Sequence, residues 1–419
     1  MTVILDISRL ISRLRYSTPS GVDRVEMAYA RGLLAQYGDA LAFAAVHPMG
    51  LYGRLPRRAA LGYLDELERR WSSEDGHPRQ RSLPSVLPQL AALLPTRKGI
   101  GSGGVYVQAS PHHLTNAGKV QRILARERAR FLCLVHDLIP IEFPEYARPS
   151  GAALHRRRIE TVASAITATR GAAIVNSAAT GRSLQPWLAP GTAIHVALLG
   201  TEKLPDPAPL TSGTVADGRP YFVCLGTIEP RKNHLLLLHL WRHLADTLPP
   251  ESVPRLVVIG RRGWENEQIV DMLERCPALV GHVEELGGIP DARLSALLRE
   301  ARALLMPSFA EGYGMPVAEA LSVGTPVICS DLPALREVGR EGPDYLDPLD
   351  GPGWKAAVLD HAARGPLHGA QMTRLPRWHN PTWGEHMAIV TDAIEQLREP
   401  GSSAHAWLSA AQPTGRIVA

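Results

Sequence analysis

The sequence is poor in cysteine, and the few cysteines that it has are spread along the chain. Its 419 residues include four, and no two of them form a C-x-x-C pair. Cys133, Cys224 and Cys329 lie in apolar, strand-like runs, and the fourth is Cys276. Such cysteines behave as small buried hydrophobic residues of a reducing compartment, which argues against a disulfide framework and against a zinc site.

Long apolar runs and cofactor fingerprints are also missing. No stretch of about 18 apolar residues occurs, so we expect no membrane-spanning helix. The N-terminus, T-V-I-L-D-I-S-R-L, lacks the basic leader and the cleavage site of a signal peptide and predicts a β-strand. No G-x-G-x-x-G follows a strand with an acidic residue about 20 positions further on, which argues against an NAD-dependent dehydrogenase. We therefore expect a cytoplasmic protein.

Charge is distributed unequally between the two halves of the chain. Residues 1–205 carry 26 Lys/Arg and 15 Asp/Glu, a net charge of +11, whereas the remainder carries 19 and 26, a net charge of −7. The basic half predicts an anionic partner, either a membrane surface that the protein contacts peripherally or a pyrophosphate-linked lipid. Solvated helix faces are the alternative explanation for any one arginine cluster. Nucleic acid is not expected, because aromatic residues make up 5% of the chain and no reader motif occurs.

Apolar strand-like runs alternate with helical patterns, which predicts an α/β fold with two Rossmann-like domains. A chain of 419 residues also exceeds the usual size of a single core. We expect an N-terminal domain over 1–205, a Pro- and Gly-rich linker over 206–219, a second domain over 220–380, an amphipathic helix over 381–398 and a tail over 399–419. The predicted strands are 3–7, 42–46, 104–108, 131–135, 173–175 and 194–197, then 221–225, 255–259, 282–286, 303–306 and 326–330. The predicted helices are 21–36, 61–70, 119–128, 151–169 and 383–397.

The segment from 307 to 327, P-S-F-A-E-G-Y-G-M-P-V-A-E-A-L-S-V-G-T-P-V, is the most informative of the chain. Glu311 and Glu319 have seven residues between them, with Gly312 and Gly314 in the gap. Pro316 suits the first helical position, because proline lacks the N–H that would be unpaired there. Loop and helix N–H groups would then face an anion, with a carboxylate at each end. This chemistry suits a sugar nucleotide.

A plainer interpretation exists for part of this segment. A glutamate in the first turn of a helix often only complements the helix dipole, and Gly324 followed by proline simply ends the helix. That interpretation accounts for Glu319 but leaves Glu311 unexplained.

A second basic motif follows the strand at 221–225. Arg231 and Lys232 precede Asn233, a suitable N-cap, and a Leu-rich helix. Two cations at a helix N-terminus oppose the dipole, and an anion shared between them would reverse the sign of that interaction. We therefore predict that they bind a diphosphate; a surface pair of no function is the alternative.

The glutamate spacing resembles the E-x7-E motif of retaining glycosyltransferases with the GT-B fold, in particular family GT4. Residues 221–233 (Y-F-V-C-L-G-T-I-E-P-R-K-N) are similar to the strand and loop that deliver a basic residue to the donor diphosphate. Residues 134–146 (L-V-H-D-L-I-P-I-E-F-P-E-Y) and 173–177 (A-I-V-N-S) resemble the acceptor-side strands. The resemblance covers nearly the whole chain, is weakest between 51 and 102, and is greatest to bacterial polysaccharide mannosyltransferases. It implies two Rossmann-like domains that face a deep cleft, and a last helix that crosses back to the first domain.

The resemblance also implies roles at the donor site. Glu319 would bind the ribose hydroxyls, and Glu311 would contact the hydroxyls of the transferred sugar. Lys232 would bind the diphosphate, and Arg231 would supply the contact that many family members make with an arginine at the position of Thr227. The catalytic set is then Glu311, His136, Lys232 and Arg231, and the donor-binding set is Glu319, Gly312, Tyr313, Gly314, Met315 and Thr227.

Acceptor residues are expected in the first domain. Residues 18–26, T-P-S-G-V-D-R-V-E, form a turn before a helix and resemble the loop where donor and acceptor approach each other. Gly21, Asp23, Arg24 and Asp137 are the acceptor-binding candidates. A turn with a helix cap would equally account for Gly21 and Asp23, and a histidine that ends an apolar strand, as His136 does, often has a structural role.

The expected activity is transfer of a hexose, best mannose from GDP-mannose, to a saccharide acceptor that is lipid-linked and belongs to a bacterial surface polysaccharide. No D-x-D pair follows an apolar strand, so we expect neither a metal nor any other cofactor. The E-x7-E resemblance implies retention of configuration, and front-face substitution is favoured because no carboxylate stands out as a nucleophile. The alternatives are a UDP- or dTDP-sugar as donor, a GT-B sugar-nucleotide epimerase, and a noncatalytic subunit that binds glycan or membrane.

Overall fold

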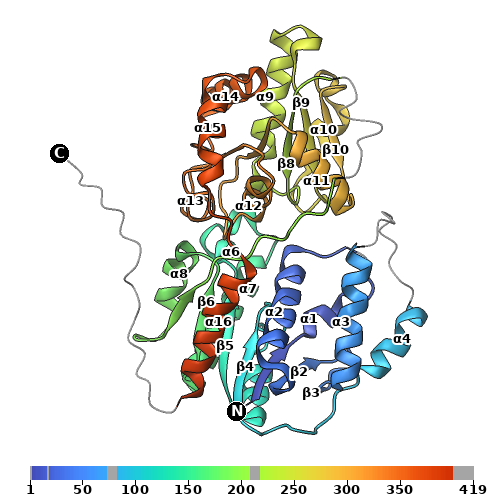
Figure 1. The fold of residues 1–419 in the computed structure, drawn as a ribbon, viewed down its shortest axis with the longest axis vertical. Coiled ribbons are helices and arrows are strands. Elements are labelled where there is room, and N and C mark those ends of the chain that lie inside the picture. Colours follow the sequence, from blue (N-terminus) through green and yellow to red (C-terminus); the bar gives the residue numbers. More distant parts are fainter. Residues whose placement is uncertain (1, 17, 73–82, 208–217, 400–419) are drawn as a thin grey trace, which may run out of the picture.

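The computed structural model describes residues 2–16, 18–72, 83–207 and 218–399. Most of the linker predicted at 206–219 and of the tail predicted at 399–419 lies outside these residues, so both stay predictions. The described chain forms two α/β halves, which Figure 1 shows as two lobes stacked along the long axis. Each half contains one sheet, and the prediction of an α/β fold with two largely parallel sheets is confirmed.

The first sheet has seven strands in the order β3-β2-β1-β4-β5-β6-β7. All neighbours are parallel except β2 and β3, which are antiparallel. The strands are β1 (Thr2–Asp6), β2 (Leu41–Val46), β3 (Tyr52–Arg54), β4 (Gly104–Gln108), β5 (Ala129–Val135), β6 (Ala172–Val175) and β7 (Ile194–Val196). Six of them match the predicted strands. The sequence did not indicate β3, because three residues at a sheet edge are too few to show an alternating pattern.

The second sheet has six strands in the order β10-β9-β8-β11-β12-β13, and all neighbours are parallel. The strands are β8 (Tyr221–Leu225), β9 (Arg255–Ile259), β10 (Val283–Leu286), β11 (Ala303–Met306), β12 (Val327–Ser330) and β13 (Asp344–Leu346). The five predicted strands are present, and β13 was missed because it is a three-residue edge strand. Near-continuous apolar runs such as V-I-C and A-L-L-M form the central strands, as buried parallel strands require.

Helices cover both faces of each sheet. In the first half they are α1 (Ser8–Ser12), α2 (Gly21–Tyr37), α3 (Arg57–Ser72), α4 (Leu83–Ala92), α5 (Ala117–Glu127), α6 (Ile139–Glu142), α7 (Gly151–Thr169) and α8 (Ala178–Leu184). In the second half they are α9 (His234–Thr247), α10 (Glu267–Arg275), α11 (Asp291–Glu300), α12 (Met315–Ser322), α13 (Pro333–Gly339), α14 (Gly351–Ala363), α15 (Pro366–Arg374) and α16 (Trp383–Arg398). Short 3-10 turns include η2 (Pro144–Tyr146), η4 (Pro230–Lys232) and η5 (Pro250–Ser252). None of the described helices is both long and apolar enough to cross a membrane.

The last helix, α16, packs on the first half although it follows the second half in sequence. It contacts α2, β4 and β7 (Figure 1). Thr382 and Glu385 form a capping box that fixes its start. His386 is buried, with Nδ1 3.1 Å from the carbonyl oxygen of Ala197 and Nε2 3.0 Å from the hydroxyl of Tyr29. The two halves are therefore joined by packing as well as by the chain.

Apolar packing also runs across the boundary between the halves. One core cluster contains Val3 and Val107 of the first sheet together with Val223 and Leu304 of the second. Two further clusters fill the other face of each sheet, one around Phe131 in the first half and one in the second. Buried apolar area contributes roughly 25 cal/mol per Å², so the shared cluster stabilises the packing of the two halves against each other.

Candidate active site

A pocket of about 200 Å³ lies where the carboxyl ends of strands from the two halves meet. Asp137 and Leu138, which follow β5, line it from the first half. Glu311 and Gly312, which follow β11, line it from the second half. Ligands of open parallel sheets bind at this edge, beyond the strand ends. The structure thus brings predicted residues from distant parts of the sequence to one place.

Gly312 lies where the loops at the two strand ends approach each other closely. A Cβ atom at this position would lie 2.6 Å from the carbonyl oxygen of His136 and 2.8 Å from Cβ of Asp137. The hydroxyl of Ser177 donates a hydrogen bond of 2.9 Å to the carbonyl oxygen of Gly312, and Thr180 Oγ1 lies 3.3 Å from it. Sequence reasoning did not propose Ser177 or Thr180, although A-I-V-N-S is a strand followed by a helix N-cap.

Glu311 is buried and held between two cations. Lys232 Nζ lies 2.5 Å from its Oε1, and a guanidinium nitrogen of Arg231 lies 2.9 Å from its Oε2. Burial raises the pKa of the Glu311 carboxyl, but Arg231 and Lys232 outweigh burial and lower that pKa to about 2. The side chain is 6% exposed. Glu311 is therefore ionised at neutral pH.

Arg231 bridges two carboxylates. Its Nε lies 2.7 Å from Oε1 of Glu229, which is 2% exposed, and the same guanidinium donates to the carbonyl oxygen of Ala310 at 2.9 Å. Burial raises the pKa of Glu229 despite the nearby cations. In this structure the anion shared by Arg231 and Lys232 is thus Glu311, a carboxylate of the chain itself, where the sequence predicted a diphosphate. A phosphate ligand would have to compete for these two cations.

Asn233 does not cap the following helix with its side chain, as the sequence had suggested. It occupies the N-cap position of α9 in the left-handed region (φ 55°), and its Nδ2 donates to the carbonyl oxygen of Pro348 at 3.0 Å. Asparagine is one of the few residues that adopt this conformation readily. The residue closes η4, so the two preceding cations turn toward Glu311.

The loop after β11 offers backbone donors. Gly314 has a φ of 103°, which favours glycine, and it is the N-cap of α12. Met315 is the first helical residue, so Pro316 lies one position later than predicted. Within the described chain, the N–H groups of Gly312, Tyr313 and Gly314 donate to no other group. Free N–H groups beside a helix N-terminus are suited to an anion.

Glu319 lies at the other end of this loop and helix, in a different environment. Its carboxylate makes no ion pair or hydrogen bond with any residue that the structure describes. Burial raises its pKa to about 7; Arg24 opposes that shift, and Asp291 and Glu202 add to it. The side chain is half-buried, so its oxygens can still be reached. A carboxylate with no partner among the described residues can accept hydrogen bonds from a ligand.

Arg24 lies beside Glu319. One guanidinium nitrogen is 3.0 and 2.8 Å from the two carboxylate oxygens of Asp291, so the pair joins α2 to α11 across the two halves. Met315 also lies at this junction, because a Cβ atom at Gly21 would be 3.2 Å from its sulfur. The sequence assigned Arg24 and Gly21 to the acceptor; the structure places Gly21 against Met315 and Arg24 near Glu319, two donor candidates on α12.

Asp23 has a structural position. It is fully buried, forms a capping box with Ser20 at the start of α2, and pairs with Arg9 at 2.7 Å and Arg13 at 3.1 Å. These contacts occupy its oxygens. The geometry therefore supports the helix-cap interpretation of this residue and offers no support for a role in acceptor binding.

His136 and Asp137 end β5 next to Gly312. Nε2 of His136 donates to the carbonyl oxygen of Ala109 at 2.8 Å, and burial lowers the pKa of the ring, which is therefore neutral. Oδ1 of Asp137 accepts from the N–H of Ile139 at 3.2 Å. In the neutral ring the Nδ1 atom is the acceptor. The arrangement gives His136 a fixed orientation.

The two remaining donor candidates take different positions. Tyr313 is buried, and its hydroxyl donates to the carbonyl oxygen of Leu199 at 2.6 Å, so its side chain ties the loop to the first half and leaves its N–H for a ligand. Thr227 is exposed just beyond β8. Across the described ranges, no three His, Cys, Asp or Glu side chains are grouped as ligands for a metal ion.

Comparisons with known proteins agree with this geometry. Residues 211–344 match the family described as "Glycosyl transferases group 1". The chain is 38% identical over 141 residues to O-antigen chain mannosyltransferase B of Escherichia coli (33% of this chain, 36% of that protein). It is 28% identical over 243 residues to the serotype-specific mannosyltransferase WbdA of the same species (53% and 28%). The matches therefore span about a third of these relatives' length.

Solved structures show the fold. Sucrose-phosphate synthase from Thermosynechococcus elongatus matches with a TM-score of 0.61 at 16% identity, over 95% of this chain and 99% of that one. Anabaena HepE in complex with UDP-glucose matches with a TM-score of 0.56 at 14% identity, over 95% and 98%. The predicted resemblance is confirmed: the chain has the GT-B fold and carries a glycosyl transferases group 1 domain.

Proposed function

We propose that this protein is a retaining glycosyltransferase that moves a hexose from a nucleotide diphosphate sugar to a saccharide acceptor. One observation carries the proposal: Glu311 and Glu319 flank a segment whose loop N–H groups donate to no described residue, and Glu311 and Gly312 line the pocket between the two halves. The cations and the loop N–H groups suit the phosphates of such a donor, and the two carboxylates suit the hydroxyls of its sugar and its ribose.

The donor in this proposal is GDP-mannose, and the acceptor is a lipid-linked saccharide of a bacterial surface polysaccharide. The names of the relatives support it, since O-antigen chain mannosyltransferase B and WbdA are both described as mannosyltransferases. HepE was solved with UDP-glucose, so UDP-sugars are included in the donor screen below.

Donor binding in this proposal exchanges partners around Glu311. The diphosphate takes Lys232, Arg231 and the free N–H groups of the loop, and Glu311 then accepts hydrogen bonds from hydroxyls of the hexose. Glu319 accepts from the ribose hydroxyls. The exchange preserves the charge balance, because each cation keeps an anion and the buried carboxylate keeps donors.

The chemical step needs no further group from outside the site. The acceptor hydroxyl attacks the anomeric carbon, the bond from this carbon to the phosphate oxygen breaks, and the hydroxyl proton passes to the leaving phosphate on the same face. Lys232 and the loop N–H groups stabilise the charge that develops on the leaving group. His136, neutral and fixed by Ala109, lies at the strand end on the acceptor side. We include no resident metal or other cofactor.

The basic first half is proposed to contact an anionic membrane. Arg122 and Arg126 on α5 and Arg156 and Arg157 on the neighbouring α7 are exposed, which supports the proposal. Arg54, counted among the basic residues of the sequence, does not take part, because it is 7% exposed and pairs with Glu127 at 2.7 Å. Co-sedimentation with phosphatidylglycerol vesicles but not with phosphatidylcholine vesicles would be the expected result.

Thermal-shift screening tests the proposed donor. A ligand at 100 times its Kd stabilises the fold by roughly 2.7 kcal/mol, so the nucleotide sugar that binds most tightly raises the melting temperature most at equal concentration. We expect that sugar to be GDP-mannose and not a UDP-, dTDP- or ADP-sugar. Transfer of radiolabelled mannose to a membrane lipid extract then tests the reaction. A protein that responds to none of the four nucleotide sugars would contradict the proposal.

A further inference from the structure

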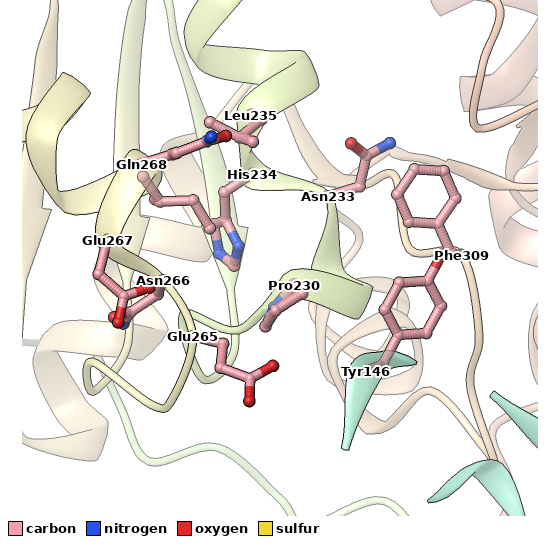
Figure 2. Close-up of a pocket in the computed structure, with 11 residues that line it drawn as sticks. Tyr146, Pro230, Asn233, His234, Leu235, Glu265, Asn266, Glu267, Gln268 and Phe309 are labelled. Carbon is pink, nitrogen blue, oxygen red and sulfur yellow. The ribbon is translucent and has the colours of Figure 1, made fainter. Parts of the chain in front are cut away.

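A second pocket, of about 400 Å³, adjoins the candidate active site and has no role so far. Figure 2 shows it between the starts of α9 and α10 and the aromatic pair Tyr146 and Phe309. Phe309 lines this pocket and also the pocket that contains Glu311, so the two pockets share a wall. A ligand bound here would therefore lie next to the candidate reaction centre.

The shared wall is aromatic and is built from both halves of the molecule. The rings of Tyr146 and Phe309 stack with centroids 5.8 Å apart and an interplanar angle of 7°, and Phe143 stacks on Tyr146 at 6.1 Å. The backbone is also fixed, because Trp264 Nε1 donates to the carbonyl oxygen of Tyr146 at 3.0 Å. A preformed aromatic surface offers an apolar ring or C–H face a place to pack.

The opposite side of the pocket is polar. The starts of α9 and α10 have no side-chain cap, and the Nδ2 atoms of Asn233 and Asn266 donate to the carbonyl oxygens of Pro348 and Ile228. The exposed side chains of Glu265, Glu267 and Gln268 lie at the rim. The pocket thus has hydrogen-bond acceptors and hydrogen-bond donors on the side opposite its aromatic wall.

His234 indicates that this polar side is built for a ligand. The residue is 1% exposed, yet within the described chain neither ring nitrogen has a hydrogen-bond partner. Figure 2 shows its ring projecting from α9 toward the loop of Glu265 and Asn266. Burial, aided by Lys232, lowers its pKa to about 4, so the ring is neutral and offers one donor and one acceptor. Buried polar groups without a partner are rare in proteins and call for an explanation.

The donor does not explain this pocket. Glu319 lies on α12, whose Val317 packs in the core cluster shared by the two halves. Helices α9 and α10 pack instead in the cluster on the other face of the second sheet, through residues such as Leu237 and Ile269. The sugar and the ribose of a donor held by Glu311 and Glu319 therefore lie on the α12 side of the sheet, and only the diphosphate cations of η4 adjoin the second pocket.

The charged side chains that line the pocket disfavour an anion as its occupant. None of the described lining residues is Lys or Arg, and two carboxylates, those of Glu265 and Glu267, stand at the rim. A pyranose fits this chemistry, because one of its faces presents C–H groups to an aromatic ring while its edge presents hydroxyls to amides, carboxylates and imidazole.

We propose that this pocket binds an uncharged sugar residue of the acceptor, one or more units away from the residue that receives the hexose. The inference rests on the proposed transferase function and adds a length requirement to it. Acceptors that reach the pocket would bind more tightly than a single sugar, because the aromatic wall gives packing that a monosaccharide at the reaction centre cannot use.

Steady-state kinetics with methyl α-mannoside and with α-linked mannose di-, tri- and tetrasaccharides tests the length requirement. For the wild-type protein we expect KM to fall about tenfold or more once the acceptor fills the pocket. Tyr146→Ala should remove that gain, leaving KM for the donor and for methyl α-mannoside unchanged. Tyr146→Phe, which keeps the ring, should behave as wild type. Glu265→Gln should weaken the long acceptors less than Tyr146→Ala, and Glu251→Gln, an exposed carboxylate on η5, should change nothing.

A binding experiment separates this inference from the proposed function. Saturation-transfer NMR with the same mannosides needs no catalysis, so it detects binding to the pocket even if the protein transfers no sugar. Stronger signals from the longer mannosides that Tyr146→Ala abolishes would support the proposal. Equal KM values and equal signals for short and long mannosides would overturn it, as would a Tyr146→Ala variant that weakens all acceptors alike. A loss confined to the KM of the nucleotide sugar would assign the pocket to the donor.

Discussion

The two glutamates of one loop and helix have opposite electrostatic environments. Glu311 is almost fully buried between Lys232 and Arg231, and these cations lower its pKa to about 2. Glu319, eight positions further along, has no ion pair in the described structure, and burial raises its pKa to about 7. The same residue type is thus a permanent anion at one end and a group that titrates near neutrality at the other.

The difference follows from which partners the fold supplies. The turn η4 points two cations at the end of β11, so Glu311 is balanced before any ligand arrives. At Glu319 the nearest cation, Arg24, is already paired with Asp291. One end of the loop therefore holds charge in place, and the other has charge available for a ligand. Substitutions at the two ends should differ in kind, and the following predictions test that.

The largest expected effect is on turnover when Lys232 is removed. Lys232→Ala should lower kcat on the order of 10²–10³-fold, because a preorganised charge at the leaving group is worth about that much, while Glu319→Ala changes kcat little. Initial rates at saturating donor concentration measure kcat of both variants. Lys355→Ala on α14 is the control for loss of a lysine. A kcat that survives Lys232→Ala would contradict the role of this cation.

The second expected effect is on stability, with opposite outcomes at the two glutamates. Glu311→Gln leaves two buried cations with one carboxylate, so the free energy of unfolding should fall by about 3–5 kcal/mol. Glu319→Gln removes a group whose charged form is disfavoured by burial. Its raised pKa means that the folded protein loses stability as pH rises through about 7. The free energy of unfolding of Glu319→Gln should therefore increase relative to that of wild type between pH 6 and pH 8.

Urea unfolding at pH 6 and at pH 8 measures both variants. Equal losses for Glu311→Gln and Glu319→Gln at pH 8 would show that the two sites do not differ as described.

Much of this comparison could be predicted from the sequence, because it rests on short-range signals. Apolar runs located 11 of the strands, and the E-x7-E spacing with its glycines located the loop. These signals depend on neighbours along the chain, so local chemistry is sufficient. The short edge strands β3 and β13 escaped because three residues carry no period.

The partners across the chain could not be predicted in the same way. The pairing of Lys232 with Glu311 joins residues that are 79 positions apart, and the pair of Arg24 with Asp291 joins the two halves. Asp23 looked like a ligand residue in the sequence, whereas folding buries it between Arg9 and Arg13. Whether a charge is free or balanced depends on tertiary contacts, which a motif does not encode.

A third, smaller effect concerns donor affinity. Glu319→Ala should raise the donor KM about 10- to 100-fold, since hydrogen bonds to a charged group contribute roughly 1.5–3 kcal/mol. The measurement is KM for GDP-mannose at pH 8, where the wild-type carboxylate is ionised. Glu202→Ala serves as the control, because that carboxylate is near Glu319 and is not proposed to touch the donor. Donor KM values that match wild type would remove Glu319 from the site.

The smallest expected effect is a shift in the pH dependence of donor binding. An ionised Glu319 accepts hydrogen bonds better than a protonated one, so donor affinity should increase as pH rises through about 7. Arg24→Ala removes the cation that lowers this pKa and should move the midpoint to higher pH. Asp291→Asn removes a nearby anion and should move it to lower pH. Titration calorimetry with GDP from pH 5.5 to pH 8.5 measures both shifts, and Glu319→Gln should flatten the profile. If Arg24→Ala and Asp291→Asn shift the midpoint in the same direction, another group is titrating. The same conclusion follows if Glu319→Gln keeps the pH dependence of wild type.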